Sequence, residues 1–192
     1  MKINILIAFL AVLIFSIAAL FEVNYLDYEM PVPYSKFNAI TFYDFKGLKK
    51  PAQTLNGAKE FAFISTSRET RLTNDHTFIA ITYFHPSRSY VFNQHIRNAG
   101  LLTHELYHFH ISEYFTRLIR KAVFEYQGNI SQSAIDDIVE MYNTQENEMQ
   151  MQYDEESYHS YVLAEQKRWE KLIDNNLASL IKFSDITTKL KN

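Results

Sequence analysis

A long stretch with helical periodicity, from about residue 97 to residue 126, constrains the fold more than any other part of the sequence. At 100° per residue, His104 and His108 fall within its apolar stripe. The other members of this stripe are Leu101, Ile111, Phe115, Leu118, Ile119 and Ala122. Two imidazoles on a buried face are costly unless they share a partner. The stripe therefore predicts a core helix whose two histidines bind something between them, and Gly128 marks its end.

The opposite side of this helix carries polar and charged residues. They are His110, Glu113, Arg117, Arg120 and Lys121. Glu113 and Arg117 stand four residues apart, a spacing at which opposite charges pair on the surface of a helix. This side is therefore predicted to be a solvated face.

Short strand-like runs precede the helical part of the chain. Alternation and a high content of β-branched and aromatic side chains predict strands at 39–45, 59–65, 77–84 and 89–92. Lys46-Gly47 and Asn56-Gly57 are turn signals between them. After the first helix, Ser131 is expected to cap a second one that reaches about Glu146, and a third is expected from about Glu155 to Ile181. Strands followed by helices indicate an α+β domain, with a small antiparallel sheet packed beside the helical half.

The first 21 residues have the pattern of a targeting segment. Residues 3–21 are almost wholly apolar, and Lys2 precedes them. This order is typical of a signal peptide, and the length is close to the roughly 20 residues that span a bilayer. We expect residues 1–21 to be a signal peptide or a membrane anchor, 22–37 a connector and 38–192 one domain. The protein is expected to be exported to the periplasm or cell envelope, with residues 3–21 as an inner-membrane anchor if they are not cleaved.

The two histidines of the apolar stripe belong to an H-E-x-x-H motif, His104-Glu105-Leu106-Tyr107-His108. On a helix both imidazoles of this motif can reach one zinc ion, and the glutamate lies near a zinc-bound water as general base. The chain has 192 residues, seven histidines and no cysteine. A thiolate zinc site, an iron–sulfur cluster and a disulfide framework are therefore excluded. The net charge of −3 gives no reason to expect nucleic-acid binding.

A catalytic zinc site of this kind needs a third protein ligand. The extended motif H-E-x-x-H-x-x-G-x-x-H is absent, because residues 111 and 114 are Ile and Tyr. His159 is the first candidate, because on the expected third helix it shares an inward stripe with Val162, Leu163, Ile173 and Leu177. Spacing alone leaves alternatives open, which are His76, His85, His95, Asp154, Glu155 and Glu156.

The sequence around the motif resembles a known family. Residues 101–113 are similar to the H-E-x-x-H-F-x-I-x-E core of the bacterial domain of unknown function 922 family, which is regarded as a family of zinc-dependent proteases. Its Y-D-x-x-T-x-H-G pattern, followed by Gln and Trp, resembles residues 153–160 with Gln166 and Trp169. Residues 42–47 and 89–91 resemble its aromatic-x-D-F-x-G and S-W-V segments.

This resemblance covers about residues 39–175 and keeps the order of the segments. Ser157, Ser160 and Tyr90 stand where the family pattern has Thr, Gly and Trp. The resemblance implies a zincin-like fold for the domain and singles out His159 among the candidates for the third zinc ligand.

These features together predict an exported zinc-dependent metallopeptidase that acts on a peptide or protein substrate. Zinc is expected at His104, His108 and His159, with Glu105 as general base. Tyr158 and Tyr161 are candidates for stabilising the oxyanion. Asp154 or Glu155 is a candidate for orienting a ligand imidazole.

Two other functions are open at this point. One is a zinc hydrolase of another cell-envelope amide such as peptidoglycan, and the other is a non-catalytic, zinc-stabilised envelope binding module. Gln166 and Trp169 are expected to pack between helices. The membrane is expected as a partner only through residues 3–21.

Overall fold

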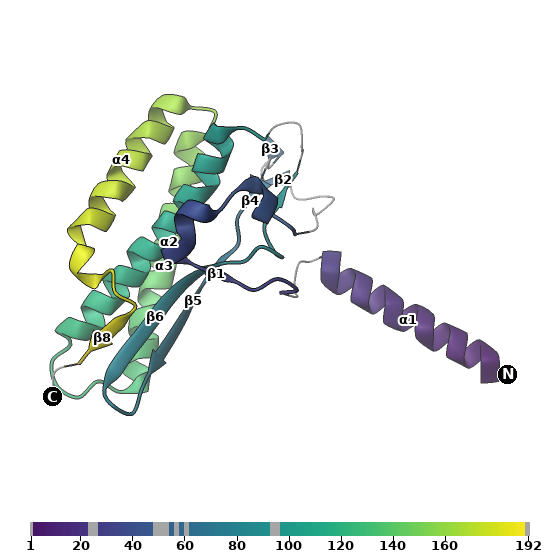
Figure 1. Ribbon diagram of the computed structural model, residues 1–192, viewed down its shortest axis with the longest axis horizontal. Coiled ribbons are helices and arrows are strands. Elements are labelled where there is room, and N and C mark those ends of the chain that lie inside the picture. The colour runs from purple at the N-terminus through teal and green to yellow at the C-terminus, as the bar shows by residue number, and fades with distance from the viewer. Residues whose placement is uncertain are drawn as a thin grey trace.

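The computed structural model describes residues 2–22, 27–47, 54–55, 58–59, 62–92 and 97–190. It has an α+β fold in which a small antiparallel sheet lies against helices (Figure 1). The α-helices are α1 (Lys2–Glu22), α2 (Ala99–Glu125), α3 (Gln132–Ser157) and α4 (Leu163–Ser179). Short 3-10 helices are η1 (Tyr34–Ala39), η2 (Phe42–Asp44) and η4 (Ile181–Phe183).

The main sheet is built around β6 (Thr77–Phe84), its longest strand. The neighbour β5 (Thr66–Leu72) pairs with β6 along its whole length, from Thr66 opposite Phe84 to Leu72 opposite Phe78. The other edge of β6 is shared by β1 (Val32–Pro33) and β8 (Thr187–Lys189), which pair with its two ends. Two small antiparallel pairs complete the strands: β2 (Thr54–Leu55) with β3 (Ala58–Lys59), and β4 (Ala62–Phe63) with β7 (Tyr90–Val91).

Helix α2 is the centre of the domain. It packs against β6 on one side and against α3 and α4 on the other. Its side chains contribute to three groups of buried residues: Leu101 and Phe109 near η2 and β4, Ile111 and Phe115 toward α4, and Ile119 and Val123 against β6 and α3. Because one helix supplies part of each group, it fixes the sheet and the other two helices relative to one another.

The sheet confirms some of the sequence predictions and corrects others. The strand predicted at 77–84 is present with the same bounds, because Phe78, Ala80, Thr82 and Phe84 alternate inward. The strand predicted at 39–45 is wrong, since 3-10 helices occupy this segment. Thr41 and Asp44 form a capping box there, and Asp44 Oδ2 accepts a hydrogen bond from the Thr41 amide at 2.8 Å.

The other strand predictions are met in part. Within 59–65 the structure describes Ala62 and Phe63 as β4, and within 89–92 it has Tyr90 and Val91 as β7. Gly47 of the predicted Lys46-Gly47 turn lies in a bend, where a Cβ would come within 2.8 Å of the Ser89 carbonyl oxygen. The Asn56-Gly57 turn lies outside the described residues.

Four of the strands lie outside the predicted ranges, namely β1, β2, β5 and β8, and the boundary between the second and third helices differs from the prediction. β5 and β8 have mainly polar sequences with no apolar alternation, and they form because β6 offers both edges for pairing. Ser131 caps α3 as predicted, by accepting a hydrogen bond from the Ala134 amide. α3, however, continues past Glu146 to Ser157, because neither Gly nor Pro interrupts it.

The charged side of α2 is not solvated, which corrects the prediction. Glu113, Arg117 and Arg120 are buried between α2, β6 and the end of α4. The predicted Glu113–Arg117 ion pair is present at 3.0 Å, and Arg120 adds a second at 2.9 Å. Arg120 also donates to the carbonyl oxygens of Ala80 and Phe183. The charges are tolerated because each is hydrogen-bonded within the network.

The start of the domain is tied to the sheet by a chain of polar contacts. His85 Nε2 lies 2.7 Å from Ser67 Oγ, and His85 Nδ1 lies 3.0 Å from both carboxylate oxygens of Asp27. Glu29 adds an ion pair with Lys46. These contacts hold residues 27–29 against the domain.

Helix α1 lies apart from the other elements (Figure 1). In the described part of the chain, no helix combines the length and apolar character needed to cross a bilayer. The assignment of residues 1–21 to a signal peptide or anchor stays a prediction.

Candidate metal centre

The two histidines of the H-E-x-x-H motif turn the same nitrogen toward each other. On α2, His104 Nε2 and His108 Nε2 lie 3.2 Å apart. Two ligands at about 2.1 Å from one tetrahedral ion are separated by about 3.4 Å. Two hydrogen-bonded amides from other helices decide which atoms of these rings carry protons.

Gln166 of α4 fixes the tautomer of His104. Its amide nitrogen donates to Tyr153 Oη at 2.7 Å and to Glu170 Oε1 at 3.1 Å, which sets the orientation of the amide. Its Oε1 therefore faces His104 Nδ1, at 3.1 Å, as an acceptor. His104 Nδ1 must therefore donate its hydrogen to Gln166 Oε1. In the neutral ring, Nε2 then carries no hydrogen, and its lone pair is free to bind a metal ion or a proton.

Gln150 of α3 fixes the tautomer of His108 in the same way. Its amide nitrogen donates to the His108 carbonyl oxygen at 3.0 Å and to Ser112 Oγ at 3.3 Å. Its Oε1 accepts from His108 Nδ1. The outward nitrogens of both rings are thus used as donors, and both Nε2 atoms point into one small region.

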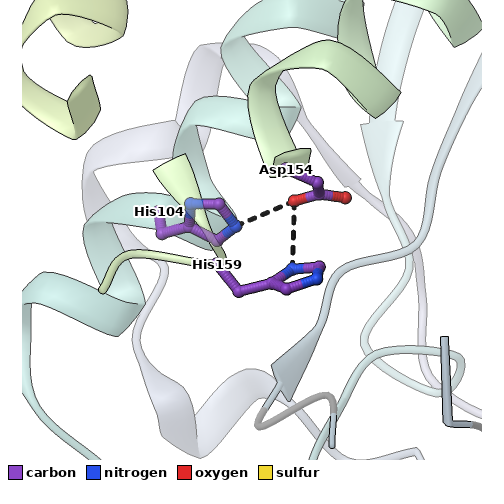
Figure 2. A group of neighbouring side chains, drawn as sticks. All are labelled: His104, Asp154 and His159. Atoms are coloured by element: carbon purple, nitrogen blue, oxygen red, sulfur yellow. Dashed lines mark hydrogen bonds and ion pairs between the residues drawn. The ribbon is translucent and has the colours of Figure 1, made fainter. Parts of the chain in front are cut away.

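Asp154 of α3 brings a carboxylate to the same region. Its Oδ1 lies 3.0 Å from His104 Nε2, 2.9 Å from His108 Nε2 and 3.3 Å from His159 Nδ1. Figure 2 shows the carboxylate of Asp154 between the rings of His104 and His159. The ligand atoms of these three residues lie within 4.8 Å of one another, and they could hold a metal ion. Lone pairs of several acceptors that converge in this way require a cation or protons between them.

The pKa values of His104, His108 and Asp154 are shifted in directions that also indicate a need for a cation or a proton between these groups. Burial lowers the pKa of His104, which favours its neutral form. Burial opposes protonation of His108 as well, but the charge and hydrogen bond of Asp154 outweigh it and raise its pKa to about 9. Burial would raise the pKa of Asp154, yet the charge of His108 and the close approach of the three imidazoles hold it well below its usual range. Without a metal ion, a proton on His108 compensates the carboxylate.

Glu105 stands beside these ligands in the wall of a cavity of about 340 Å³. One wall consists of residues 62–66, and the other includes Glu105, His108, Asp154, His159 and residues of α3. Glu105 is only 4% exposed, and the Ile64 amide donates a hydrogen bond to its carboxylate. Burial raises the pKa of Glu105 to about 7. The carboxyl can therefore take up and release a proton near neutral pH.

His159 reaches the site from a turn and not from a helix, which corrects the expected placement. α3 ends at Ser157, and α4 begins at Leu163. Tyr158, His159 and Ser160 have φ values of 47°, 50° and 76°, all in the left-handed region that non-glycine residues rarely adopt. Hydrogen bonds from the Tyr158 and His159 amides to the Asp154 carbonyl oxygen hold the turn.

The other predicted candidates lie away from the ligands. Tyr158 and Tyr161 are exposed, at 57% and 62%, and neither lines the cavity. Glu155 is exposed, and Glu156 accepts hydrogen bonds from Gln152 and Trp169. His110 is not on an outward face, because it is half-buried and packs on Phe37 with ring centroids 4.0 Å apart. His76 and His85 lie outside the cavity, and His95 is outside the described residues.

Sequence reasoning missed the two glutamines that orient the imidazoles. The sequence predicts that Gln166 packs between helices, and it predicts no role for Gln150. One signal was available: Gln150 and Asp154 stand four residues apart, so they share a face of α3. The contact between that face and His108 depends on helix packing and could not be read from the sequence.

Comparisons with protein-family models, with curated proteins and with solved structures find no match for this chain. The function must therefore be argued from the site itself.

Proposed function

We propose that this protein is a zinc-dependent metallopeptidase of the zincin type. The observation that supports it most strongly is the convergence of His104 Nε2, His108 Nε2 and Asp154 Oδ1 within 3.2 Å of one another, beside a buried glutamate that lines the same cavity. A purely structural cluster has no need of a buried carboxyl group in the wall of the adjoining cavity. That combination of ligands and Glu105 is what hydrolysis of an amide requires.

The donor set favours zinc among the common metals. His104, His108 and His159 offer imidazole nitrogens, Asp154 offers one carboxylate oxygen, and the chain contains no thiol. Zinc binds nitrogen and oxygen ligands of this kind, whereas calcium and magnesium prefer oxygen alone. When bound, zinc supplies Lewis acidity, which polarises a carbonyl and makes water acidic near neutral pH.

Each residue of the chain has a defined task in this proposal. Gln166 and Gln150 hold the imidazoles of His104 and His108 in the tautomer with Nε2 free. Glu105 accepts the proton of the attacking water and delivers it to the leaving amine. Its raised pKa of about 7 suits both transfers, because the carboxyl can change protonation at little cost. The Ile64 amide keeps the carboxylate directed at the cavity.

The test is hydrolysis of fluorescently labelled casein by the full-length, zinc-loaded protein. Glu105→Gln should lower the rate by roughly 10²- to 10⁴-fold while it keeps its zinc, because only the general base is removed. Glu155→Gln is the matched control, since this exposed glutamate lies on α3 next to Asp154 and should leave the rate unchanged. Equal rates for wild type and Glu105→Gln would contradict the proposal.

A second candidate is a non-catalytic binding module that keeps zinc for stability. The observation that favours it is the position of Asp154, whose oxygen sits close to all three imidazoles and could complete a closed ligand set. One zinc per chain, with no hydrolysis of casein or muropeptides that depends on Glu105, would support this candidate.

A further inference from the structure

Asp154 contacts the imidazoles on the wrong side for a carboxylate that merely orients metal ligands. Such a carboxylate binds the ring nitrogen that faces away from the ion. In this protein the outward nitrogens of His104 and His108 are already bonded to glutamine oxygens. Asp154 instead lies 3.0 and 2.9 Å from their inward Nε2 atoms. It therefore stands among the ligands themselves.

We propose that Asp154 is a displaceable fourth ligand, which closes the metal site at rest and opens it when its carboxylate turns away. This inference rests on the proposed function, because it concerns the same metal and the same cavity. In the closed arrangement three imidazoles and one carboxylate fill a four-coordinate shell, so no position is left for water. In the open arrangement the position of Asp154 Oδ1 becomes available for reaction.

The surroundings of Asp154 allow this movement. Its side chain is 29% exposed, compared with 1% for His104, and it lines the cavity of about 340 Å³. Among the described residues, every ion pair and hydrogen bond of this carboxylate is made through Oδ1. Rotation of the side chain into the cavity would therefore break contacts only with the imidazoles.

The turn that follows α3 is a second feature that favours opening of the site. Asp154 lies in the last turn of α3, and this turn is followed by three residues in the left-handed region. Each such residue is strained relative to an ordinary conformation. His159 is the middle one, so this ligand lies in a strained turn that begins four residues after Asp154. A site with one removable oxygen ligand and three imidazoles keeps its metal when it opens.

Cobalt substitution tests the inference, because the visible spectrum of Co²⁺ reports the number of its ligands. The full-length protein is stripped with a chelator, loaded with Co²⁺ and titrated with azide, which needs a free position on the ion. Wild type should show little change. Asp154→Ala should bind azide at least about tenfold more tightly, a difference of about 1.4 kcal/mol. Glu155→Ala is the control and should behave as wild type, because this neighbouring side chain is exposed.

The outcomes separate this inference from the proposed function. If wild type and Asp154→Ala bind azide equally well, Asp154 does not close the site, and the inference fails while the metal site stands. If both Asp154→Ala and Asp154→Asn lose cobalt while they remain folded by circular dichroism, Asp154 is an indispensable ligand, which also overturns the inference. If wild type binds no cobalt, the proposed function itself fails.

Discussion

Gln166 Oε1 lies 3.1 Å from Nδ1 of His104, although the two residues are 62 positions apart in the chain. This bond is made by a buried amide whose nitrogen is held by Tyr153 and Glu170. It leaves His104 Nε2 free for a metal, so α4 takes part in the site without providing a ligand.

The first prediction concerns this hydrogen bond. Gln166→Leu should weaken zinc binding by about 10- to 100-fold, because His104 loses the acceptor that fixes its tautomer. Competition with a zinc-binding dye measures the affinity. Gln152→Leu is a suitable control, because Gln152 is exposed on α3 and its amide donates to the side chain of Glu156 and not to a ligand imidazole. An unchanged affinity in a folded Gln166→Leu protein would refute the role of this residue.

The strained turn yields a second prediction. Ser160 has a φ of 76°, a conformation that glycine adopts without steric cost. Ser160→Gly should raise the free energy of unfolding by roughly 0.5–1 kcal/mol, since relief of strain exceeds the added entropy of the unfolded chain. Urea unfolding measures it. The matched variant Ser133→Gly, in the first turn of α3, should be neutral or destabilising. A loss of stability in Ser160→Gly would contradict the strain argument.

Buried charges next to α2 lead to a third prediction. Glu113→Gln should lower the free energy of unfolding by about 3 kcal/mol, because Arg117 and Arg120 would both lose the carboxylate with which they form ion pairs. Glu140→Gln, at an exposed position of α3, should change it by less than about 0.5 kcal/mol. Urea unfolding of both variants measures the contrast. Similar values for the two variants would mean that the network is not needed for stability.

A fourth prediction concerns the loss of folding stability at acidic pH. Burial, with the nearby charge of Arg117, lowers the pKa of His110 to about 4, and Tyr34 bonds to its Nδ1. A lowered histidine pKa favours the neutral form in the fold, so the stability it provides is complete above the unfolded pKa of about 6.5 and is lost as the pH falls toward 4.

Between about pH 7.5 and pH 5 this loss should amount to at most about 2 kcal/mol. Urea unfolding at the two pH values compares wild type with His110→Gln, which has no imidazole to protonate. The variant should lose less stability on acidification than wild type. If both proteins lose the same amount, His110 is not the group responsible.

The sequence predicted the elements whose side-chain pattern is set by a single buried face. β6 alternates four inward residues, and α2 carries its apolar stripe from Leu101 to Ala122, so both could be located closely. β5 could not, because its residues Thr66–Leu72 are mostly polar and it forms by pairing with β6. The 3-10 helices at 34–39 and 42–44 have aromatic sequences that also suit a strand.

The candidate site also has a part that could be predicted from the sequence and a part that could not. The local spacing of His104 and His108 on one helix sufficed to bring them together, since i and i+4 side chains share a face. Contacts between elements could not be derived locally. The burial of Arg120, the bonds from Gln150 and Gln166, and the approach of Asp154 all depend on how α3, α4 and the sheet pack around α2.

Zinc content of the purified full-length protein tests the central claim most directly. After equilibration with zinc and gel filtration, mass spectrometry should find close to one zinc per chain in wild type and in Glu105→Gln, because the general base is not a ligand. A variant with both His104→Ala and His108→Ala should retain almost none, although circular dichroism should show that it is folded. Absence of zinc from wild type, or unchanged zinc in the double variant, would contradict the proposed metal site.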